Sequence, residues 1–168
     1  MQEQLTIEQA AERIAPLDAE ALRAAAARQD KLLKPAGSLG ELEAISIRFA
    51  GITGQVKNSA KRKVHFLFGS DHGVCDEGVS GSPQYFTKVL MELYARNMGC
   101  GIDVLCRHVG ADLRIFDLGV RDMGPTPNVD ASCRLMPNGT ENFAKGRAMP
   151  KETARRAMEF GIALALRA

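Results

Sequence analysis

The chain has 168 residues, of which 45% are hydrophobic and 25% are charged, as in a typical folded globular protein. This composition argues against disordered, collagen-like and low-complexity classes, and the length fits one ordinary domain. A formal net charge of +2 and an aromatic content of 5% offer neither the basic surface nor the stacking rings used by nucleic-acid-binding proteins, so we expect no nucleic-acid partner.

Two helices are predicted at the start of the chain. Apolar residues recur at helical spacing over residues 7–14, and Thr6 and Gln9 fit a capping box in front of them. An Ala-rich stretch predicts a second helix over residues 18–32, because alanine favours helix and Asp18 is a good N-cap.

A turn rich in proline and glycine follows over residues 34–41 and leads into a third predicted helix. Ser38 and Glu41 are three residues apart and fit a capping box at the start of this helix. We expect the helix to end near Gly51, and we assign residues 1–54 to an N-terminal helical segment.

The chain then changes to an alternation of strands and helices. The apolar runs at residues 64–68 and 113–118 are of the type found in buried parallel strands. Between them, an apolar stripe predicts a long helix from Pro83, which suits a first helical position, to residue 105, with room for a break near residues 99–101. A strand, a helix and a strand of these lengths form a parallel, right-handed unit.

Residues 119–150 are rich in proline, glycine and asparagine and predict a long loop with one short strand near residues 132–136. Loops of this length are often functional, and a final helix is predicted over residues 150–168. We therefore predict that residues 55–168 form one incomplete α/β domain. It is a partial Rossmann-like parallel sheet of two to three strands with helices on both faces, and its open strand edge favours association with a partner.

Other features of the sequence argue against membrane, metal and cofactor binding. No apolar run approaches the ~20 residues that span a bilayer, and the first five residues lack the basic start and apolar core of a secretory signal. We expect a cytoplasmic protein without a membrane partner. The four cysteines form no CxxC pair and have no histidine at zinc-finger spacing, so we predict free thiols and no metal site. We also expect no cofactor.

The loop after the first predicted strand is the candidate functional site. Ligands of open α/β folds bind at the carboxyl ends of strands, and this loop brings Asp71, His72 and Glu77 close together in the sequence. These residues fit a substrate-binding edge with acid–base groups, and equally a polar turn in which side chains bond the backbone. Asp117, at the end of the second predicted strand, allows the same two interpretations.

Four motifs resemble the signatures of one enzyme family. They are KPAGSLGELE (residues 34–43), DHGVCDEGVSGSP (71–83), FDLGV (116–120) and GRAM (146–149). Their order and spacing are similar to those of the nicotinate-nucleotide:dimethylbenzimidazole phosphoribosyltransferase family from about Gln29 to the C-terminus. Four matches in register are much more specific than any one of them.

The resemblance implies a step of cobalamin synthesis. In it, phosphoribose moves from nicotinate mononucleotide to 5,6-dimethylbenzimidazole, and the products are α-ribazole phosphate and nicotinate. A carboxylate acting as general base must take the proton of the benzimidazole. The resemblance implies that Ser82 and position 90 lie beside the bound base, and it includes Asp71, His72 and Glu77 in the substrate-binding loop.

The sequence departs from the family in three ways. Family chains are about twice as long, and their phosphate-binding glycine loop and catalytic glutamate correspond to positions beyond Ala168. Leu90 stands where the family often has a glutamine that faces the base, so a polar contact is lost. Residues 98–103 read MGCGID where the family has GGAAIN.

These features predict the N-terminal half of such a transferase, inactive by itself. We expect a second copy in a homodimer, or a complementary C-terminal half, to complete it. One alternative is a non-catalytic ligand-binding or regulatory module that kept the scaffold. Another is a divergent enzyme that uses Asp71, His72 or Glu77 as its base.

Overall fold

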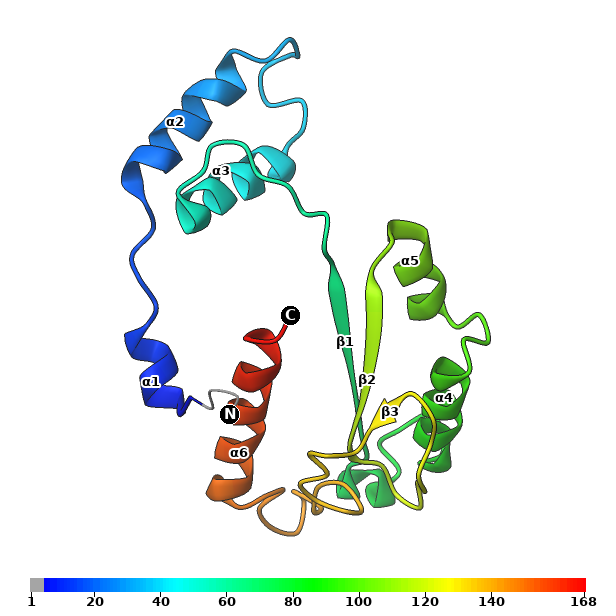
Figure 1. The fold of residues 1–168 in the computed structure, drawn as a ribbon. Coiled ribbons are helices and arrows are strands. Elements are labelled where there is room, and N and C mark those ends of the chain that lie inside the picture. Colours follow the sequence, from blue (N-terminus) through cyan, green and yellow to red (C-terminus); the bar gives the residue numbers. More distant parts are fainter. Residues whose placement is uncertain (1–4) are drawn as a thin grey trace. The chain divides into compact units, whose positions relative to one another are not determined.

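The computed structural model describes residues 5–168 and shows an α/β protein (Figure 1). The described chain divides into two compact units: one is Ala11–Lys61, and the other contains Arg62–Ala168 together with residues 5–10. The elements in chain order are α1 (Ile7–Glu12), α2 (Ala19–Asp30), α3 (Glu41–Thr53), β1 (Val64–Ser70), the 3-10 helix η1 (Gly73–Glu77), α4 (Tyr85–Ala95), α5 (Gly101–Val109), β2 (Asp112–Gly119), β3 (Val129–Asp130) and α6 (Lys151–Ala165).

The predicted caps of the first two helices are confirmed. The Thr6 hydroxyl accepts a hydrogen bond from the Gln9 backbone N–H at 3.2 Å, and the Gln9 side chain accepts one from the Thr6 N–H at 2.9 Å. Asp18 caps α2 by accepting from the N–H groups of Glu20 and Ala21, both at 2.9 Å. These bonds satisfy N–H groups that have no partner inside a helix.

Helices α2 and α3 pack against each other through small residues. Ala50 of α3 is completely buried. A Cβ atom added to Gly51 would lie only 2.7 Å from the Cδ2 atom of Leu22 on α2. The glycine therefore allows the two helix backbones to approach closely.

The capping box predicted at Ser38 and Glu41 is wrong. Helix α3 starts after Gly40, whose φ of 53° is left-handed, and no side chain caps it. The side chain of Glu43 organises this turn instead: its Oε1 atom accepts from the Leu39 N–H at 3.1 Å and from Lys34 Nζ at 2.7 Å. The first sequence motif is thus closed by an ion pair.

The three strands form one parallel sheet in the order β1-β2-β3. The third strand does not lie at residues 132–136, as predicted, but at Val129–Asp130, where it pairs with Ile115 and Phe116 of β2. The predicted stretch remains in the loop because it begins with a turn, in which the Arg134 N–H donates to the Ala131 carbonyl at 3.3 Å. The side chain of Arg134 donates to the Met123 carbonyl at 3.0 Å.

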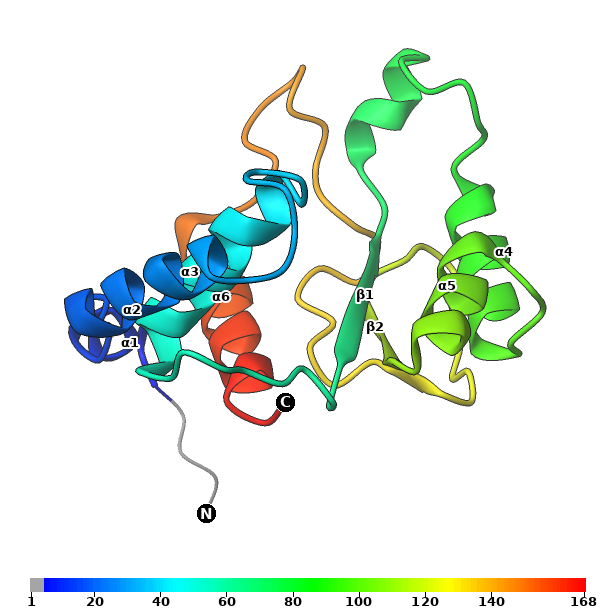
Figure 2. The same cartoon turned by 90° about the horizontal axis from the view of Figure 1, so that it is seen from above.

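Helices cover both faces of the sheet, as predicted (Figure 2). Helices α4 and α5 lie on one side, where Met91 and Ala95 of α4 pack with Ile115 of β2 in the core. On the other side, Phe160 of α6 meets the ring of Phe116 edge-on, with centroids 5.7 Å apart. Continuous apolar strands are expected in a parallel sheet that is covered in this way.

The connection between β1 and β2 contains two helices, with the break close to the expected position. Helix α4 ends at Ala95 and α5 begins at Gly101. Between them, Asn97 and Gly99 have φ values of 54° and 81°, a left-handed conformation that ends a right-handed helix. Asp103, which is buried, accepts from the Gly99 N–H at 3.1 Å and secures the start of α5.

Candidate functional site

A pocket of about 400 Å³ lies at the carboxyl end of β1, between this strand, the loop that follows it and α4. Its lining is mainly apolar, with residues that include Leu67, Phe68, Phe86, Met91 and Tyr94. A volume of this size suits a flat, drug-sized molecule, and a mainly apolar wall with few polar groups is typical of small-molecule sites.

Ser82 and Leu90, two of the five predicted site residues, both line this pocket. The neighbouring Ser80 hydroxyl fixes the loop there: it donates to the Ser82 carbonyl at 2.8 Å and accepts from the Ser82 N–H at 3.2 Å. Helix α4 starts at Tyr85 after an N-cap residue that makes no side-chain bond. Ser82 therefore does not cap α4, and its exposed hydroxyl lies at the pocket wall.

Asp71 lies under the loop and is only 3% exposed. Its Oδ2 atom accepts from the Arg121 N–H at 2.7 Å, and its carbonyl oxygen accepts from the Thr140 N–H at 2.9 Å. A Cβ atom on Gly139 would lie 2.1 Å from that same carbonyl oxygen. Asp71 thus joins the loop after β1 to two segments of the long loop after β2.

His72 and Glu77 join the same two loops. His72 Nδ1 lies 3.1 Å from the Thr140 hydroxyl oxygen. Glu77 Oε1 accepts from Asn142 Nδ2 at 2.6 Å and from Lys145 Nζ at 2.7 Å. The side chains of Asp71, His72 and Glu77 therefore face the long loop, and none of the three residues lines the pocket that contains Ser82 and Leu90.

The contacts of Glu77 also affect its ionisation. The hydrogen bond from Lys145 lowers the pKa of the Glu77 carboxyl from its ordinary value of 4.5, and the hydrogen bond from Asn142 makes a smaller contribution in the same direction. The hydrogen bond to Glu77 in turn raises the pKa of Lys145. Bonds to the charged form of a carboxylate favour that form. The link between the two loops is therefore an ion pair at neutral pH.

This ion pair predicts a pH-dependent stability difference between the wild type and Glu77→Gln. Because the folded-state pKa is lowered, the charge stabilises the fold above pH 4.5 and this contribution is lost as pH falls through the folded-state pKa. We expect the wild type to melt at a higher temperature than the variant at pH 7, with the difference disappearing towards pH 3. Glu141→Gln, an exposed carboxylate of the long loop, is the control; an equal difference at both pH values would contradict the prediction.

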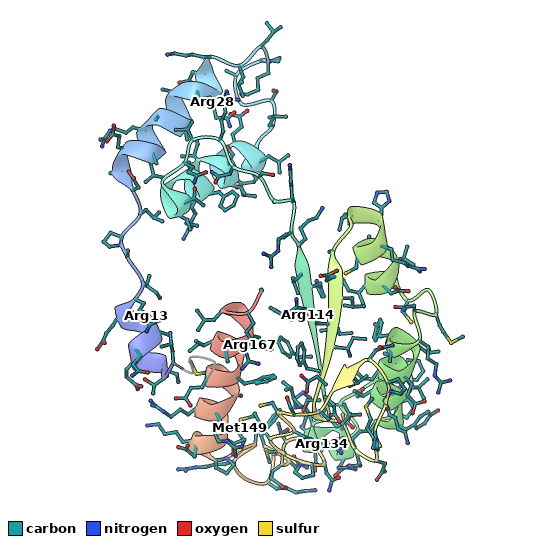
Figure 3. The ribbon with its side chains drawn as sticks, in the orientation of Figure 1. Arg13, Arg28, Arg114, Arg134, Met149 and Arg167 are labelled. Carbon is teal, nitrogen blue, oxygen red and sulfur yellow. The ribbon has the colours of Figure 1, made fainter. Side chains whose placement is uncertain are left out.

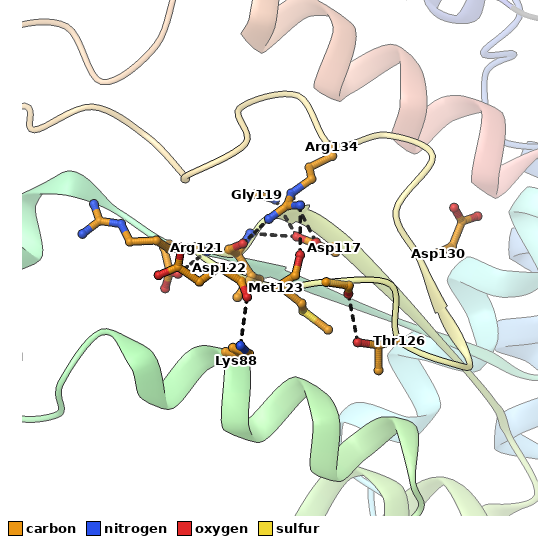
Figure 4. A network of polar contacts seen from close by, with 12 residues as sticks. Lys88, Asp117, Gly119, Arg121, Asp122, Met123, Thr126, Asp130 and Arg134 are labelled. Carbon is orange, nitrogen blue, oxygen red and sulfur yellow. Dashed lines mark hydrogen bonds and ion pairs between the residues drawn. The ribbon is translucent and has the colours of Figure 1, made fainter.

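A second polar network fixes the carboxyl end of β2 (Figure 4). Asp117, 2% exposed, accepts from the N–H groups of Gly119 at 2.9 Å and Val120 at 2.7 Å. Arg134 places its Nε atom 3.4 Å from Asp117 Oδ2 and donates to the Val120 carbonyl. Lys88 of α4 reaches the Asp122 carbonyl at 2.9 Å. The structure therefore supports the second of the two interpretations of Asp117, in which its carboxylate bonds the following turn.

Three residues of this region were not predicted. Arg134 lies among the clustered loop side chains at the carboxyl end of the sheet (Figure 3), and a separation of 17 positions from Asp117 gives no periodic signal. Cys75 and Tyr94 line the pocket. Both follow from the motif and the helix stripe once the pocket is located, since Cys75 lies inside the loop motif and Tyr94 is four residues after Leu90.

Within residues 5–168, no group of three or more histidine, cysteine or carboxylate side chains could hold a metal ion. Over the same part of the chain, no helix has the length and apolar character needed to cross a membrane. The four cysteines are free thiols, and Cys106 is the buried one among them.

Comparison with known proteins gives one consistent result. A family model described as phosphoribosyltransferase matches residues 14–168. The nicotinate-nucleotide–dimethylbenzimidazole phosphoribosyltransferase of Geobacter sulfurreducens is 48% identical over 158 residues, which are 94% of this chain and 44% of the relative. The enzyme of the same name from Geotalea uraniireducens is 44% identical over 163 residues, which are 96% of this chain and 46% of the relative.

A solved structure has a similar fold over the matched part of the chain. The crystal structure of the nicotinate-nucleotide–dimethylbenzimidazole phosphoribosyltransferase from Thermus thermophilus superposes with a TM-score of 0.75 at 34% identity. The superposition covers 84% of this chain and 42% of that chain. The chain therefore spans slightly less than half the length of the relatives it matches.

Proposed function

The chain belongs to the nicotinate-nucleotide–dimethylbenzimidazole phosphoribosyltransferase family, and we propose that it forms the part of the active site that binds the aromatic base. In the proposed reaction, phosphoribose moves from nicotinate mononucleotide to 5,6-dimethylbenzimidazole, and α-ribazole phosphate and nicotinate are released. One observation carries the proposal: Ser82 and Leu90, both matched to base-binding positions, line one mainly apolar pocket at the carboxyl end of β1.

The pocket fits the demands of the base. A bicyclic aromatic ring gains most from apolar contact, which Leu90, Met91 and Phe86 offer, while the Ser82 hydroxyl can bond a ring nitrogen. The pocket wall holds one ring nitrogen of the base towards the anomeric carbon of the ribose. This nitrogen forms the new bond to that carbon as nicotinate leaves. The contribution of these residues is therefore orientation of the attacking base.

Asp71, His72 and Glu77 have a positioning role in this proposal. Each bonds the long loop after β2, and together they fix the segment that carries Ser82. The proton released by the base then goes to a group outside these three residues. The proposal therefore assigns no general base among them.

The proposed transferase needs more than the 168 residues. More than half of each relative lies outside the matched region, and we propose that the transferase acts only when a second copy of this chain or the complementary part of the family protein completes the site. In this proposal the isolated chain binds the base weakly and does not catalyse the transfer of phosphoribose.

A non-catalytic ligand-binding module is the second candidate. The observation that favours it is Leu90, which removes the amide that family members often present to the base. Such a module binds benzimidazoles with or without the complementary part of the family protein, and it forms no α-ribazole phosphate in either case. Measuring binding and product formation side by side separates the two functions.

Substitutions in the pocket test the base-binding role directly. We expect Leu90→Lys to weaken the binding of 5,6-dimethylbenzimidazole at least about tenfold, because an ammonium group in an apolar pocket is costly to desolvate. Ser82→Ala should weaken it several-fold through the loss of one hydrogen bond. Ligand-observed NMR titration measures both. Leu105→Lys, at an exposed leucine of α5, is the control; equal affinities for Leu90→Lys and this control would refute the role.

A further inference from the structure

Part of the wall of the proposed base pocket is formed by a close contact between strand β1 and helix α4. Gly69 of β1 and Met91 of α4 both line the pocket. Gly69 is buried, and a Cβ atom added to it would lie 2.5 Å from the Sδ atom of Met91 and 2.7 Å from its Cε atom. The terminal atoms of Met91 therefore occupy the space that a larger residue at position 69 would fill.

The protein core holds Met91 on its other side. Met91 is 3% exposed and belongs to the buried core cluster together with Ile115 and Val120. Protein interiors are close-packed, so a displaced Met91 side chain finds little space in that cluster. The pocket of about 400 Å³ offers free volume beside it. A methyl group at position 69 would therefore move the thioether of Met91 into the pocket.

Met91 lies further along α4 than the polar residue assigned to the base. Ser82 precedes α4, which begins at Tyr85. At a rise of 1.5 Å per residue, Met91 lies about 9 Å beyond Tyr85 along the helix, close to the length of a substituted bicyclic ring. In 5,6-dimethylbenzimidazole the two ring nitrogens and the two methyl groups are at opposite ends of the molecule. A base with a nitrogen at the Ser82 hydroxyl therefore directs its methyl groups towards Met91.

We propose that Met91 determines the specificity of the pocket for a base with methyl groups at the edge opposite its nitrogens, and that Gly69 is the positioning residue for the Met91 thioether. This inference rests on the proposed function and names the feature of the base that the pocket recognises. The flexible, polarizable thioether of methionine adapts well to small apolar groups. Burial of two methyl groups against it favours the dimethylated base over unsubstituted benzimidazole about tenfold.

A purely structural role for the contact between Gly69 and Met91 leads to a different expectation. In that case the contact only holds β1 against α4, and a change in it weakens the binding of every base by the same factor. The specificity role instead changes the ratio of two affinities. Benzimidazole and 5,6-dimethylbenzimidazole differ only in the two methyl groups, so the ratio of their affinities reports on the contact with Met91.

Ligand-observed NMR titration of the full chain with the two bases measures this ratio. We expect the wild type to bind 5,6-dimethylbenzimidazole about tenfold more tightly than benzimidazole. Gly69→Ala should weaken the binding of the dimethylated base at least about tenfold and that of benzimidazole about threefold or less, because the displaced thioether fills the space of the methyl groups.

Two further variants make the test specific. Met91→Val in the Gly69→Ala background removes the displaced thioether and should recover at least about threefold of the lost affinity for 5,6-dimethylbenzimidazole, since neighbouring substitutions are coupled. Gly124→Ala is the matched control, because a Cβ atom there would meet no atom of the described residues within 4 Å. It should leave both affinities unchanged.

Circular dichroism first establishes that each variant is folded. If Gly69→Ala does not fold, Met91→Leu provides the test, because it nearly conserves the volume of the core and shortens the reach of the side chain. It should lower the preference for the dimethylated base at least about threefold. A wild type that binds both bases equally would overturn the proposal, as would equal losses for the two bases in Gly69→Ala.

Leu90→Lys separates this inference from the proposed function. If Leu90→Lys weakens both bases while the ratio of affinities stays constant in Gly69→Ala, the proposed function stands and the role of Met91 fails. If Leu90→Lys changes neither affinity, the base does not bind in this pocket, and the proposed function fails together with the inference that rests on it.

Discussion

Asp117→Ala is expected to destabilise the protein by about 3 kcal/mol, with a fall in melting temperature of roughly 10 °C. The carboxylate is 2% exposed and accepts hydrogen bonds from the N–H groups of Gly119 and Val120. Alanine leaves both N–H groups without an acceptor. It also leaves the partly buried guanidinium of Arg134 without its counter-charge. Losses of this kind are among the largest that single substitutions cause.

Two further variants make this prediction specific. Asp117→Asn keeps an oxygen that can accept from the turn and should show an intermediate loss. Asp112→Ala changes an exposed carboxylate at the start of the same strand and should change stability by less than about 0.5 kcal/mol. Thermal and urea unfolding provide the measurement. Equal stabilities for Asp117→Ala and Asp112→Ala would show that the network in Figure 4 does not hold the end of β2.

The elements that depend on neighbouring residues could be predicted from the sequence. The cap at Asp18 and the capping box at Thr6 and Gln9 follow from short-range spacing and are confirmed. The two long strands follow from their apolar runs. The box expected at Ser38 failed because spacing does not encode the left-handed conformation of Gly40, which alters the geometry of the helix start.

The parts that depend on distant contacts could not be predicted in the same way. His72 meets Thr140 across 68 positions, and Glu77 meets Asn142 across 65. No local pattern links such pairs. The sequence therefore indicates that Asp71, His72 and Glu77 lie in one loop, but it does not indicate that their side chains face the long loop after β2. The division into residues 1–54 and 55–168 stays a prediction.

The pocket residues are an intermediate case. Ser82 and Leu90 were expected to act together only through the family resemblance, since they lie on a loop and on a helix. In the structure both line the same pocket. The structure adds Cys75 and Tyr94, which could be recognised only after the pocket was located, because neither residue type has a fixed role in base binding.

The second large effect concerns turnover. We expect the isolated chain to form no detectable α-ribazole phosphate, and the chain combined with the unmatched part of the Geobacter sulfurreducens relative to form it at least about a thousand times faster. Enzymes typically accelerate their reactions by about a million-fold or more. Partial reconstitution of the active site is therefore sufficient for product formation to be detected. The reason is that the chain matches only 44% of the relative and, in the proposed function, contributes only the orientation of the base.

Leu90→Lys in the combined sample is the matched control for this assay. It should abolish most of the product formation by preventing the base from entering the pocket, whereas Leu105→Lys should leave it unchanged. Loss of activity in both would indicate a general effect of the added charge.

The most direct measurement is a product assay on the purified chain, with nicotinate mononucleotide and 5,6-dimethylbenzimidazole as substrates. It is run with and without the unmatched part of the Geobacter sulfurreducens relative. The account predicts α-ribazole phosphate only in the combined sample. Rapid, sustained product formation by the pure chain, or none in a stable complex that binds both substrates, would contradict it.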